Sequence, residues 1–285
     1  MTIAEAKKLI TTTLQGKYDN REANAIAGLL IEHITGLSHT FQIIETNFLF
    51  SDKQKTELRD AVKKLTAFVP IDHIIGEKEF LNITLKVNYH VLIPRPETEE
   101  LVEWIRESND TKAKLNILDI GTGSGCIALA LKESLTLSTV CGVDISDEAL
   151  KVSKSNALYN NLDVNFVKTD ILSNSIADEI DLKYDVIVSN PPYIRESEKK
   201  LMHDNVLKHE PNRALFVADN NALIFYEEII KKCDALLKES GWLYFEINEA
   251  FGNEMISLFQ RYGFRDVELK QDLFNKDRMI RGRKC

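Results

Sequence analysis

The sequence has few cysteines and no long apolar run. Its 285 residues include four cysteines, and no two of them form a Cys-x-x-Cys pair or show metal-ligand spacing: Cys126, Cys141, Cys233 and Cys285. This excludes a disulfide framework and a cysteine-based metal site, and it favours reduced thiols. The first residues, MTIAEAKKLITTT, lack the apolar core of a signal peptide, and no segment approaches the length of a membrane span. We therefore expect a cytoplasmic protein without a metal and without a membrane partner.

The sequence also has fewer basic than acidic residues. The sequence has 36 Lys and Arg against 44 Asp and Glu, a formal net charge of −8. Proteins that bind nucleic acid irrespective of sequence normally carry a basic face, so no direct nucleic-acid binding is expected. The basic residues between positions 278 and 284 are a candidate patch, but a solvated final strand explains them better. The length predicts two domains or one large one.

Residues 1–75 have the pattern of a small helical domain. Two capping boxes are predicted at helix starts, Thr2 with Glu5 and Ser51 with Gln54. After Ser51, apolar residues recur every three or four positions as far as Phe68, which indicates one buried helix face. Pro70 ends that helix.

The apolar period changes from helical to two beyond this domain. Four apolar residues alternate with polar ones and predict a half-buried strand: Leu81, Ile83, Leu85 and Val87. A turn at Asn88-Tyr89 and a second strand ending at Leu92-Ile93 would complete a β-hairpin. We predict a hairpin linker over residues 76–96. A helix then begins near Glu97, after two prolines stiffen the IPRPETE segment at residues 93–99.

From residue 115 onward, strand and helix patterns alternate. The expected strands are Leu115–Ile120, Thr139–Val143, Val164–Val167, Tyr184–Ser189 and Trp242–Ile247, with helices such as Asp147–Tyr159 and Asn221–Lys238 between them. Such alternation predicts a parallel sheet covered by helices on both faces. Two further strands are expected at Phe264–Lys270 and Met279–Gly282. Residues 97–285 are thus predicted to form an α/β domain.

A glycine-rich turn follows the first of these strands. Gly121-Thr122-Gly123-Ser124-Gly125 precedes a helix that starts near Cys126, and glycines there let the backbone pass close to a ligand. A dinucleotide fold would require its third glycine at position 126, where this chain has cysteine. The carboxylate of Asp119 would repel a pyrophosphate and suit a cofactor with a cationic amino-acid group. Helix capping is the alternative role for Asp119.

Acidic residues also end the next two strands. Asp144 is placed to accept hydrogen bonds from both ribose hydroxyls of a nucleoside, and a turn acid before Ser146 is the alternative. Asp170 is placed to accept from an adenine amino group while Ile171 packs on the ring, although a purely structural role explains Asp170 equally well. The glycine loop and the two acids together predict an adenosine-containing cofactor.

The strand ending at Ser189 leads into Asn190-Pro191-Pro192-Tyr193, the most informative tetrapeptide of the chain. Two prolines fix the backbone and remove two donors, so the turn offers carbonyl acceptors in a rigid frame. We expect a planar NH₂ group here, with one N–H on the Asn190 side chain, the other on the Pro191 carbonyl, and the Tyr193 ring packed against it. Aligning that nitrogen with an electrophilic methyl group supplies much of the catalysis by proximity. A packing turn is the alternative.

These residues resemble the class I methyltransferases that use S-adenosylmethionine, among which NPPY marks the amino-group methylators. Four further segments resemble the HemK/PrmC family: IPRPETE, GEKEF at Gly76–Phe80, Glu210-Pro211 and Asp277-Arg278. The resemblance spans nearly the whole chain and implies a doubly wound, mostly parallel seven-stranded sheet. It also implies methyl transfer, leaving S-adenosylhomocysteine, to the side-chain nitrogen (N5) of the glutamine in the Gly-Gly-Gln motif of class I peptide chain release factors.

The resemblance and the pattern of acids at strand ends together assign roles to individual residues. The predicted cofactor residues are Asp119, Gly121, Thr122, Gly123, Ser124, Gly125, Asp144, Asp170, Ile171 and Asn190. The catalytic and substrate-binding residues are Asn190, Pro191, Pro192 and Tyr193, with Arg95 either shaping the substrate pocket or pairing with a neighbouring acid. Ile171 stands where relatives often have tryptophan. The resemblance implies that the helical domain recognises the protein substrate.

Other functions fit parts of the sequence. A methyltransferase acting on the glutamine of a ribosomal protein is disfavoured by IPRPETE, and an adenine-N6 methyltransferase on nucleic acid is disfavoured by the acidic balance. A nicotinamide oxidoreductase would require glycine at position 126. A non-catalytic adapter that binds the cofactor is compatible with the sequence.

Overall fold

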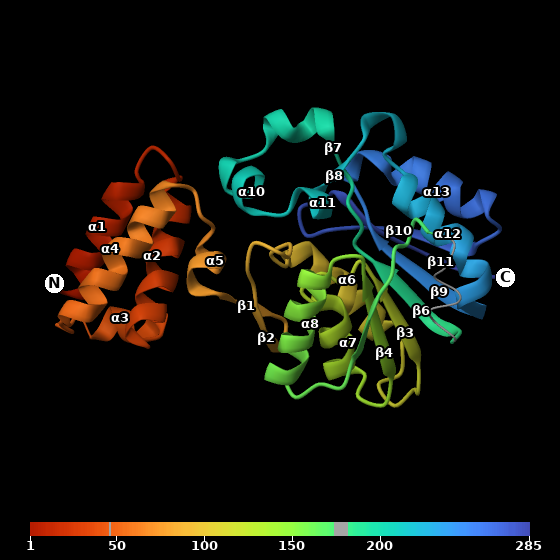
Figure 1. Cartoon of the computed structure of the whole chain (residues 1–285), viewed down its shortest axis with the longest axis horizontal. Helices are drawn as coiled ribbons and strands as arrows, with labels where there is room; N and C mark the ends of the chain where they lie inside the picture. The colour runs from red at the N-terminus through yellow and green to blue at the C-terminus, as the bar shows by residue number, and fades with distance from the viewer. Residues whose placement is uncertain (46, 174–181) are drawn as a thin grey trace. The chain divides into compact units, whose positions relative to one another are not determined.

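The computed structural model describes residues 1–45, 47–173 and 182–285, which form two compact units (Figure 1). The helical unit contains Met1–Gly76 together with His203–His209, and the sheet unit contains Glu77–Met202 and Glu210–Cys285. The sequence predicts the first boundary near residue 75, but it does not predict that residues 203–209 join the helical unit.

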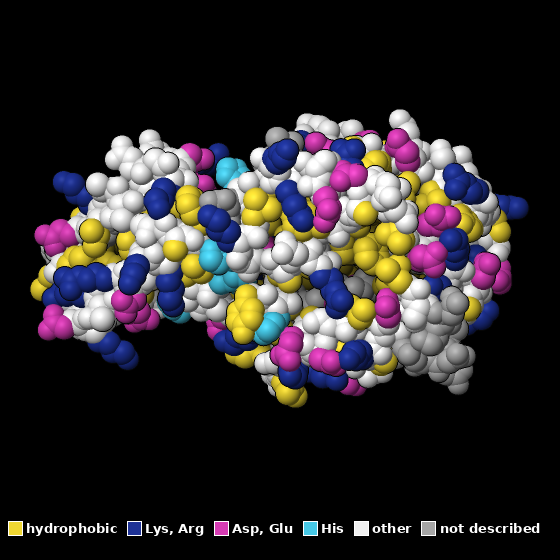
Figure 2. All heavy atoms as spheres, turned by 45° about the horizontal axis from the view of Figure 1, so that its top comes forward, with side chains coloured by type: hydrophobic (Ala, Val, Ile, Leu, Met, Phe, Trp, Pro, Cys, Tyr) yellow, Lys and Arg dark blue, Asp and Glu magenta, His cyan; other side chains and the backbone are white. Residues whose placement is uncertain are grey.

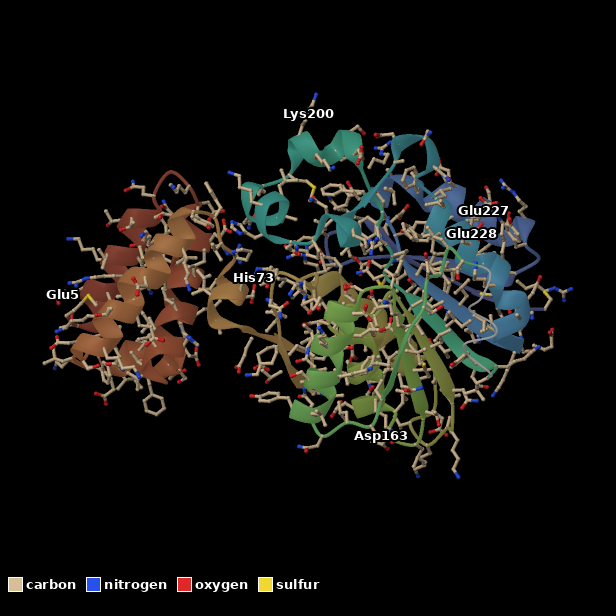
Figure 3. All side chains as sticks on the ribbon, viewed as in Figure 1. Glu5, His73, Asp163, Lys200, Glu227 and Glu228 are labelled. Atoms are coloured by element: carbon tan, nitrogen blue, oxygen red, sulfur yellow. The ribbon has the colours of Figure 1, made fainter. Side chains whose placement is uncertain are left out.

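The helical unit is built around a single apolar core. Its helices are α1 (Ile3–Leu14), α2 (Asn20–Thr35), α3 (His39–Ile44), α4 (Asp52–Thr66), α5 (Ile71–Ile75) and α10 (Asp204–His209). Both predicted capping boxes are confirmed at the starts of α1 and α4, and Figure 3 labels Glu5 of the first. Helix α4 ends at Thr66, ahead of Pro70, and Phe68 then takes a left-handed φ of 63°. A His209 ring nitrogen lies 3.1 Å from the carbonyl of Ala67, which joins α10 to this unit.

The hairpin at the start of the sheet unit corrects the strand assignment made from the alternation. Its strands are β1 (Glu77–Phe80) and β2 (Ile83–Lys86), paired antiparallel. The turn lies at Leu81, whose φ is 48°, and not at Asn88-Tyr89, and residues 88–93 form no strand. The Asn88 side chain accepts the His90 N–H at 2.9 Å, which closes a turn where the second strand was expected.

The hairpin is anchored to the sheet unit rather than free. Asn156 accepts the Lys86 N–H at 2.7 Å and donates to the Lys86 carbonyl at 3.1 Å. Asn160 makes the same pair of contacts with Thr84, at 3.3 and 2.8 Å. Both asparagines lie at the end of one helix, so their amides continue the hairpin's hydrogen bonding onto it.

The central sheet confirms the doubly wound, mostly parallel fold. Its strands are β3 (Asn116–Ile120), β4 (Thr139–Asp144), β5 (Asn165–Lys168), β6 (Tyr184–Ser189), β9 (Leu237–Glu246), β10 (Arg265–Gln271) and β11 (Asp277–Arg283). The order is β10-β11-β9-β6-β3-β4-β5, in which β9, β6, β3, β4 and β5 run parallel and β11 and β10 pair antiparallel. The strands expected from residue 115 onward are all present, and β9 starts earlier than predicted.

Helices cover both faces of this sheet, as the alternation predicts. Helices α6 (Pro96–Glu107), α7 (Cys126–Ser134) and α8 (Asp147–Tyr159) contribute to one apolar cluster, and α12 (Ile224–Leu236) and α13 (Gly252–Arg261) contribute to the other. Neighbouring residues of β3 divide between the faces, since Ile117 belongs to the first cluster and Leu118 to the second. On the outer side of α12, Glu227 and Glu228 (Figure 3) form ion pairs with Lys231.

Short elements complete the sheet unit near the carboxyl ends of the parallel strands. They are β7 (Ile194–Arg195), β8 (Phe216–Val217), α11 (Asn212–Leu215) and the 3₁₀ helices Glu196–Leu201, Asp219–Asn221 and Glu249–Phe251. Strands β7 and β8 pair in parallel. Within the described ranges, no helix is both long and apolar enough to span a bilayer.

Candidate active site

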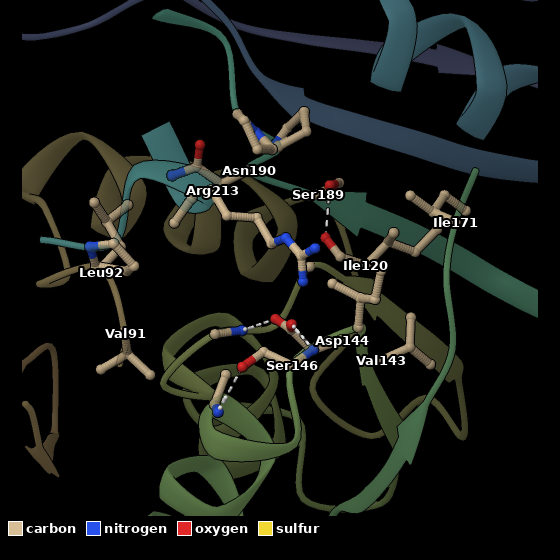
Figure 4. A pocket seen from close by; sticks show the side chains of 18 of the residues that line it. Val91, Leu92, Ile120, Val143, Asp144, Ser146, Ile171, Ser189, Asn190 and Arg213 are labelled. Atoms are coloured by element: carbon tan, nitrogen blue, oxygen red, sulfur yellow. Dashed lines mark hydrogen bonds between the residues drawn. The ribbon is translucent and has the colours of Figure 1, made fainter. Parts of the chain in front are cut away.

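A cavity of about 450 Å³ opens in the sheet unit where the strand order reverses (Figure 4). Strands β3, β4 and β6 end there, at the edge of a parallel sheet where ligands characteristically bind. Predicted site residues that line it are Gly121, Gly123, Asp144, Asp170, Ile171, Asn190, Pro191 and Pro192. The structure thus brings together residues from four separate segments of the chain.

The glycine loop forms the floor of this cavity. The N–H groups of Gly121 and Thr122 each donate to the Val143 carbonyl at 2.9 Å, which ties the loop to β4. Gly125 has a φ of 84°, and a Cβ there would lie 3.1 Å from side-chain atoms of Leu129 and Ser153. A side chain at position 125 is therefore both strained and crowded. Thr122 and Ser124 are buried and do not line the cavity, so only the first half of the loop faces a ligand.

Asp119 lies beneath the loop and not in the cavity wall. One of its oxygens accepts from the Thr122 hydroxyl at 2.6 Å and from the Ala128 N–H in the first turn of α7 at 3.2 Å. Complete burial raises the pKa of Asp119 to about 7, against the lowering effect of these hydrogen bonds. The observed contacts are those of the helix-capping alternative, and direct contact with a cofactor amino group stays a prediction.

This burial makes stability depend on pH. Because the folded-state pKa of Asp119 exceeds its ordinary value of 3.8, folding favours the neutral carboxyl, and stability is lost as the pH rises from 4 toward 7. The Asp119→Asn variant cannot ionise. Relative to wild type, its free energy of unfolding should therefore improve by about 2 kcal/mol between pH 5 and pH 7. Urea denaturation of both proteins at several pH values measures this difference.

The exposed Asp163 (Figure 3) offers a matched control, since Asp163→Asn makes the same chemical change at a surface carboxyl. Parallel profiles for Asp119→Asn and wild type would contradict the assignment of this titration to Asp119.

Asp144 presents its carboxylate to the cavity from the end of β4 (Figure 4). One oxygen accepts the Gly123 N–H and the other the Ser146 N–H, both at 2.9 Å. Burial raises the pKa of Asp144, and the backbone hydrogen bonds and the charge of Arg213 oppose this shift. Asp144 thus forms the turn before Ser146 and also faces the cavity, so the two interpretations of this residue are compatible.

Arg213 is a cavity residue that sequence reasoning missed. It comes from α11, and Figure 4 shows its guanidinium reaching from the upper wall toward Asp144. Its neighbourhood held one signal, the Glu210-Pro211 pair of the family resemblance, but no local pattern marks an arginine two positions later as a cavity residue.

The opposite wall of the cavity is apolar. Ile171 follows β5 and lines the cavity beside Leu172, while the Asp170 carboxylate accepts the Leu172 N–H at 2.9 Å. Asp170 therefore shapes this turn as well as lining the cavity. A flat aromatic ring could pack between such side chains with one polar edge toward Asp170.

The segment Asn190–Tyr193 forms the rim next to the glycine loop. The Ser189 hydroxyl donates to the Ile120 carbonyl at 2.6 Å, which joins the ends of β6 and β3. Asn190, Pro191 and Pro192 line the cavity, but Tyr193 does not. The Tyr193 hydroxyl donates to Glu246 at 2.9 Å, and burial together with that carboxylate raises the pKa of Tyr193 well above its ordinary value. Packing of Tyr193 on a substrate stays a prediction.

Two buried residues contact this rim. The Thr98 hydroxyl accepts from Asn190 Nδ2 at 3.1 Å and donates to Glu246 at 2.6 Å. Both residues could have been identified from the sequence, because Thr98 belongs to IPRPETE and Glu246 ends β9. An acid at the carboxyl end of a strand is the same signal that identified Asp144.

Arg95 and Glu210 form an ion pair, which is one of the two roles considered for Arg95. The guanidinium contacts one oxygen of Glu210, a carboxylate that is only 1% exposed, and the other oxygen accepts the Ile93 N–H at 3.2 Å. Arg95 does not line the cavity. The pair holds the IPRPETE segment to the start of the Glu210–Arg213 turn, and both segments border the site. No cluster of His, Cys, Asp and Glu suited to a metal ion occurs in the part of the chain that the structure describes.

Known protein families match both units of the chain. Residues 97–215 match the model of the methyltransferase small domain, and residues 5–76 match that of the PrmC N-terminal domain. The release factor glutamine methyltransferase of Flavobacterium psychrophilum is 38% identical over 284 residues, which cover 99% of each chain. The protein of the same name from Bacteroides thetaiotaomicron is 40% identical over 272 residues, 95% of this chain and 96% of that one.

Solved structures show the same fold at lower identity. The N-terminal domain of human METTL16, in complex with S-adenosylhomocysteine, has a TM-score of 0.52 and 18% identity, covering 82% of this chain and 83% of that one. A methyltransferase from Pyrococcus furiosus has a TM-score of 0.53 and 15% identity, covering 82% of this chain and 99% of that one. At these identities the likeness concerns the class I methyltransferase fold alone.

Proposed function

The chain belongs to the family of release factor glutamine methyltransferases, and we propose that it methylates N5 of the glutamine in the Gly-Gly-Gln motif of class I peptide chain release factors. The observation that carries this proposal is the rigid Asn190–Tyr193 rim beside a cavity that presents Asp144 and the glycine loop. Such a rim suits a planar NH₂ group, and a glutamine side chain ends in one.

The cavity fits S-adenosylmethionine, which supplies the electrophilic methyl group. Its volume of about 450 Å³ lies within the range of small-molecule sites. Asp144 would hold the ribose hydroxyls, Ile171 and Leu172 would contact the adenine ring, and Asp170 would accept from its amino group. Gly121 and Gly123 leave space for the amino-acid portion. Ile171 covers less of a ring than a tryptophan at this position would, so we expect a weaker contact at that wall.

The rim residues act on the substrate amide. Asn190 Oδ1 and the Pro191 carbonyl would each accept one N–H, which aligns the nitrogen with the methyl group. The amide nitrogen is a poor nucleophile because its lone pair is delocalised, so alignment and two acceptors supply most of the rate enhancement. Attack forms the N–C bond as the methyl–sulfur bond breaks, leaving S-adenosylhomocysteine. The methylated amide is then strongly acidic and loses its extra proton to water.

A protein acceptor suits the surface better than a nucleic acid. On the face drawn in Figure 2, Lys and Arg side chains are interspersed with Asp and Glu across the described residues. Sequence-independent binding to a phosphate backbone instead uses a continuous basic surface. We propose that the helical unit helps to recognise the release factor. Because that substrate works in translation, we also propose a cytoplasmic location.

Transfer of radiolabel from S-adenosylmethionine tests the acceptor. The protein is incubated with a purified class I release factor and with the same factor carrying alanine for the Gly-Gly-Gln glutamine. Label is expected on the wild-type factor and at background on the alanine factor. Equal label on both would move the acceptor to another residue. Label on neither would contradict a release factor substrate, and a ribosomal protein and adenine-containing nucleic acid would be assayed next.

A further inference from the structure

Thr98 and Glu246 connect the two ends of the Asn190–Tyr193 segment through one buried carboxylate. Glu246 Oε2 accepts from the Thr98 hydroxyl at 2.6 Å, and Glu246 Oε1 accepts from the Tyr193 hydroxyl at 2.9 Å. Thr98 is 2% exposed and Glu246 is 1% exposed. Inside a protein such bonds are strong, and an unpartnered group is costly, so the arrangement is rigid.

The direction of these hydrogen bonds determines which atom of the Asn190 amide faces Thr98. Burial raises the pKa of Glu246, and the hydrogen bonds from Thr98 and Tyr193 and the charge of Arg278 oppose this shift and favour the ionised carboxylate. The Thr98 hydroxyl carries one proton, which it donates to that carboxylate, so toward Asn190 it can only accept. Asn190 therefore turns Nδ2 to Thr98, at 3.1 Å. Because the amide group is planar, Oδ1 then lies on the side opposite to Thr98, as an acceptor for another donor.

We propose that Thr98 and Glu246 are positioning residues for methyl transfer, holding Asn190 so that its oxygen, and not its NH₂ group, meets the substrate amide. This inference rests on the proposed function. Rotation of the Asn190 amide by half a turn would set one NH₂ group against another, and the site would lose an acceptor. The proposal gives IPRPETE a role beyond starting α6, since Thr98 in its first turn reaches the rim.

Kinetics of Thr98→Val and Thr98→Ser test the proposal. Valine has the shape of threonine without the hydroxyl, so Thr98→Val should lower kcat by at least about tenfold, as expected for a misplaced reactive group. The Kd for S-adenosylhomocysteine should stay within about threefold of wild type. Thr98→Ser retains the hydroxyl and should restore kcat. A merely structural role would lower the melting temperature without changing kcat of the folded fraction, and that result would overturn the proposal.

Glu246→Gln tests the other member of the pair. The glutamine amide accepts on one side and donates on the other, so it cannot serve both the Thr98 and Tyr193 hydroxyls as acceptor. We expect a loss of kcat similar to that of Thr98→Val, and a double variant no slower than the more impaired single variant, because both changes release the same group. Fully multiplicative losses would show that the two residues act independently and would contradict the proposal.

A measurement on the free protein separates this inference from the proposed function. The side-chain NH₂ signals of Asn190, assigned by their absence in Asn190→Ala, should exchange slowly with solvent in wild type and Thr98→Ser and faster in Thr98→Val. Equal exchange rates in all three would overturn the inference even if release factor is methylated. Conversely, failure of the wild-type protein to methylate release factor would contradict the proposed function, while the exchange rates would still test how Thr98 holds Asn190.

Discussion

Replacing Asn190 with alanine is expected to lower kcat for release factor methylation by about 1,000-fold while leaving the protein folded. The variant removes the side-chain acceptor for one N–H of the substrate amide, and the alignment of the nitrogen depends on that acceptor. Asn190 lies at the cavity rim and is only partly buried. We therefore expect the alanine variant to fold with an intact sheet. Single-turnover methylation at saturating cofactor measures the effect on the chemical step directly.

Asn253 is a suitable control for this prediction. It lies exposed in the first turn of α13, so Asn253→Ala should retain wild-type kcat. An Asn190→Ala variant that turned over at the wild-type rate would show that the Pro191 carbonyl and the cavity position the amide unaided.

Replacing Asp144 with alanine is expected to raise the Kd for S-adenosylhomocysteine by at least about 100-fold. Two hydrogen bonds from ribose hydroxyls to a carboxylate contribute on the order of 1.5–3 kcal/mol each, and the variant removes both. It also removes the acceptor for the Gly123 N–H and so loosens the floor of the cavity. Isothermal titration with S-adenosylhomocysteine measures the loss in the absence of any protein substrate.

Two companion variants sharpen this second prediction. Asp144→Asn keeps the shape and one acceptor oxygen, and it should lose less affinity than the alanine variant. Asp147→Ala removes an exposed acid three residues later that pairs with Lys168, and it should bind like wild type. If Asp144→Ala bound the nucleoside as tightly as wild type, Asp144 would have only the turn-forming role that its contact with Ser146 already shows.

The sheet unit is predictable because each of its elements is encoded locally. Strand Tyr184–Ser189 and helix Asp147–Tyr159 coincide with the predicted ranges, since a short apolar run or an apolar face repeating with helical period needs no distant partner to be recognised. The parallel order of the strands then brings their carboxyl ends to one edge, and this alone predicts that Asp144 and Asn190 share a site.

The hairpin shows where a local pattern was insufficient. The period-two alternation starts at Leu81 and predicts a strand from there, but Leu81 lies in a turn and adopts a left-handed backbone conformation that leucine rarely takes. Asn156 and Asn160, more than 60 residues later, bind the backbone of β2 at Lys86 and Thr84. The alternation correctly predicts the burial of Ile83, Leu85 and Val87, but Leu81 is only partly buried and the position of the turn is wrong.

The site itself divides in the same way. The sequence by itself determined the fold class, the glycine loop, the acid that ends β4 and the rim Asn190–Tyr193, because each is a short motif whose geometry follows from backbone chemistry. Only the tertiary structure decided that Asp119 lies under the loop, that Arg95 pairs with Glu210, and that Thr98 and Glu246 hold Asn190. The contacts of Arg95 and Thr98 join residues 92 or more positions apart in the sequence, and no local pattern of residues encodes contacts between such distant positions.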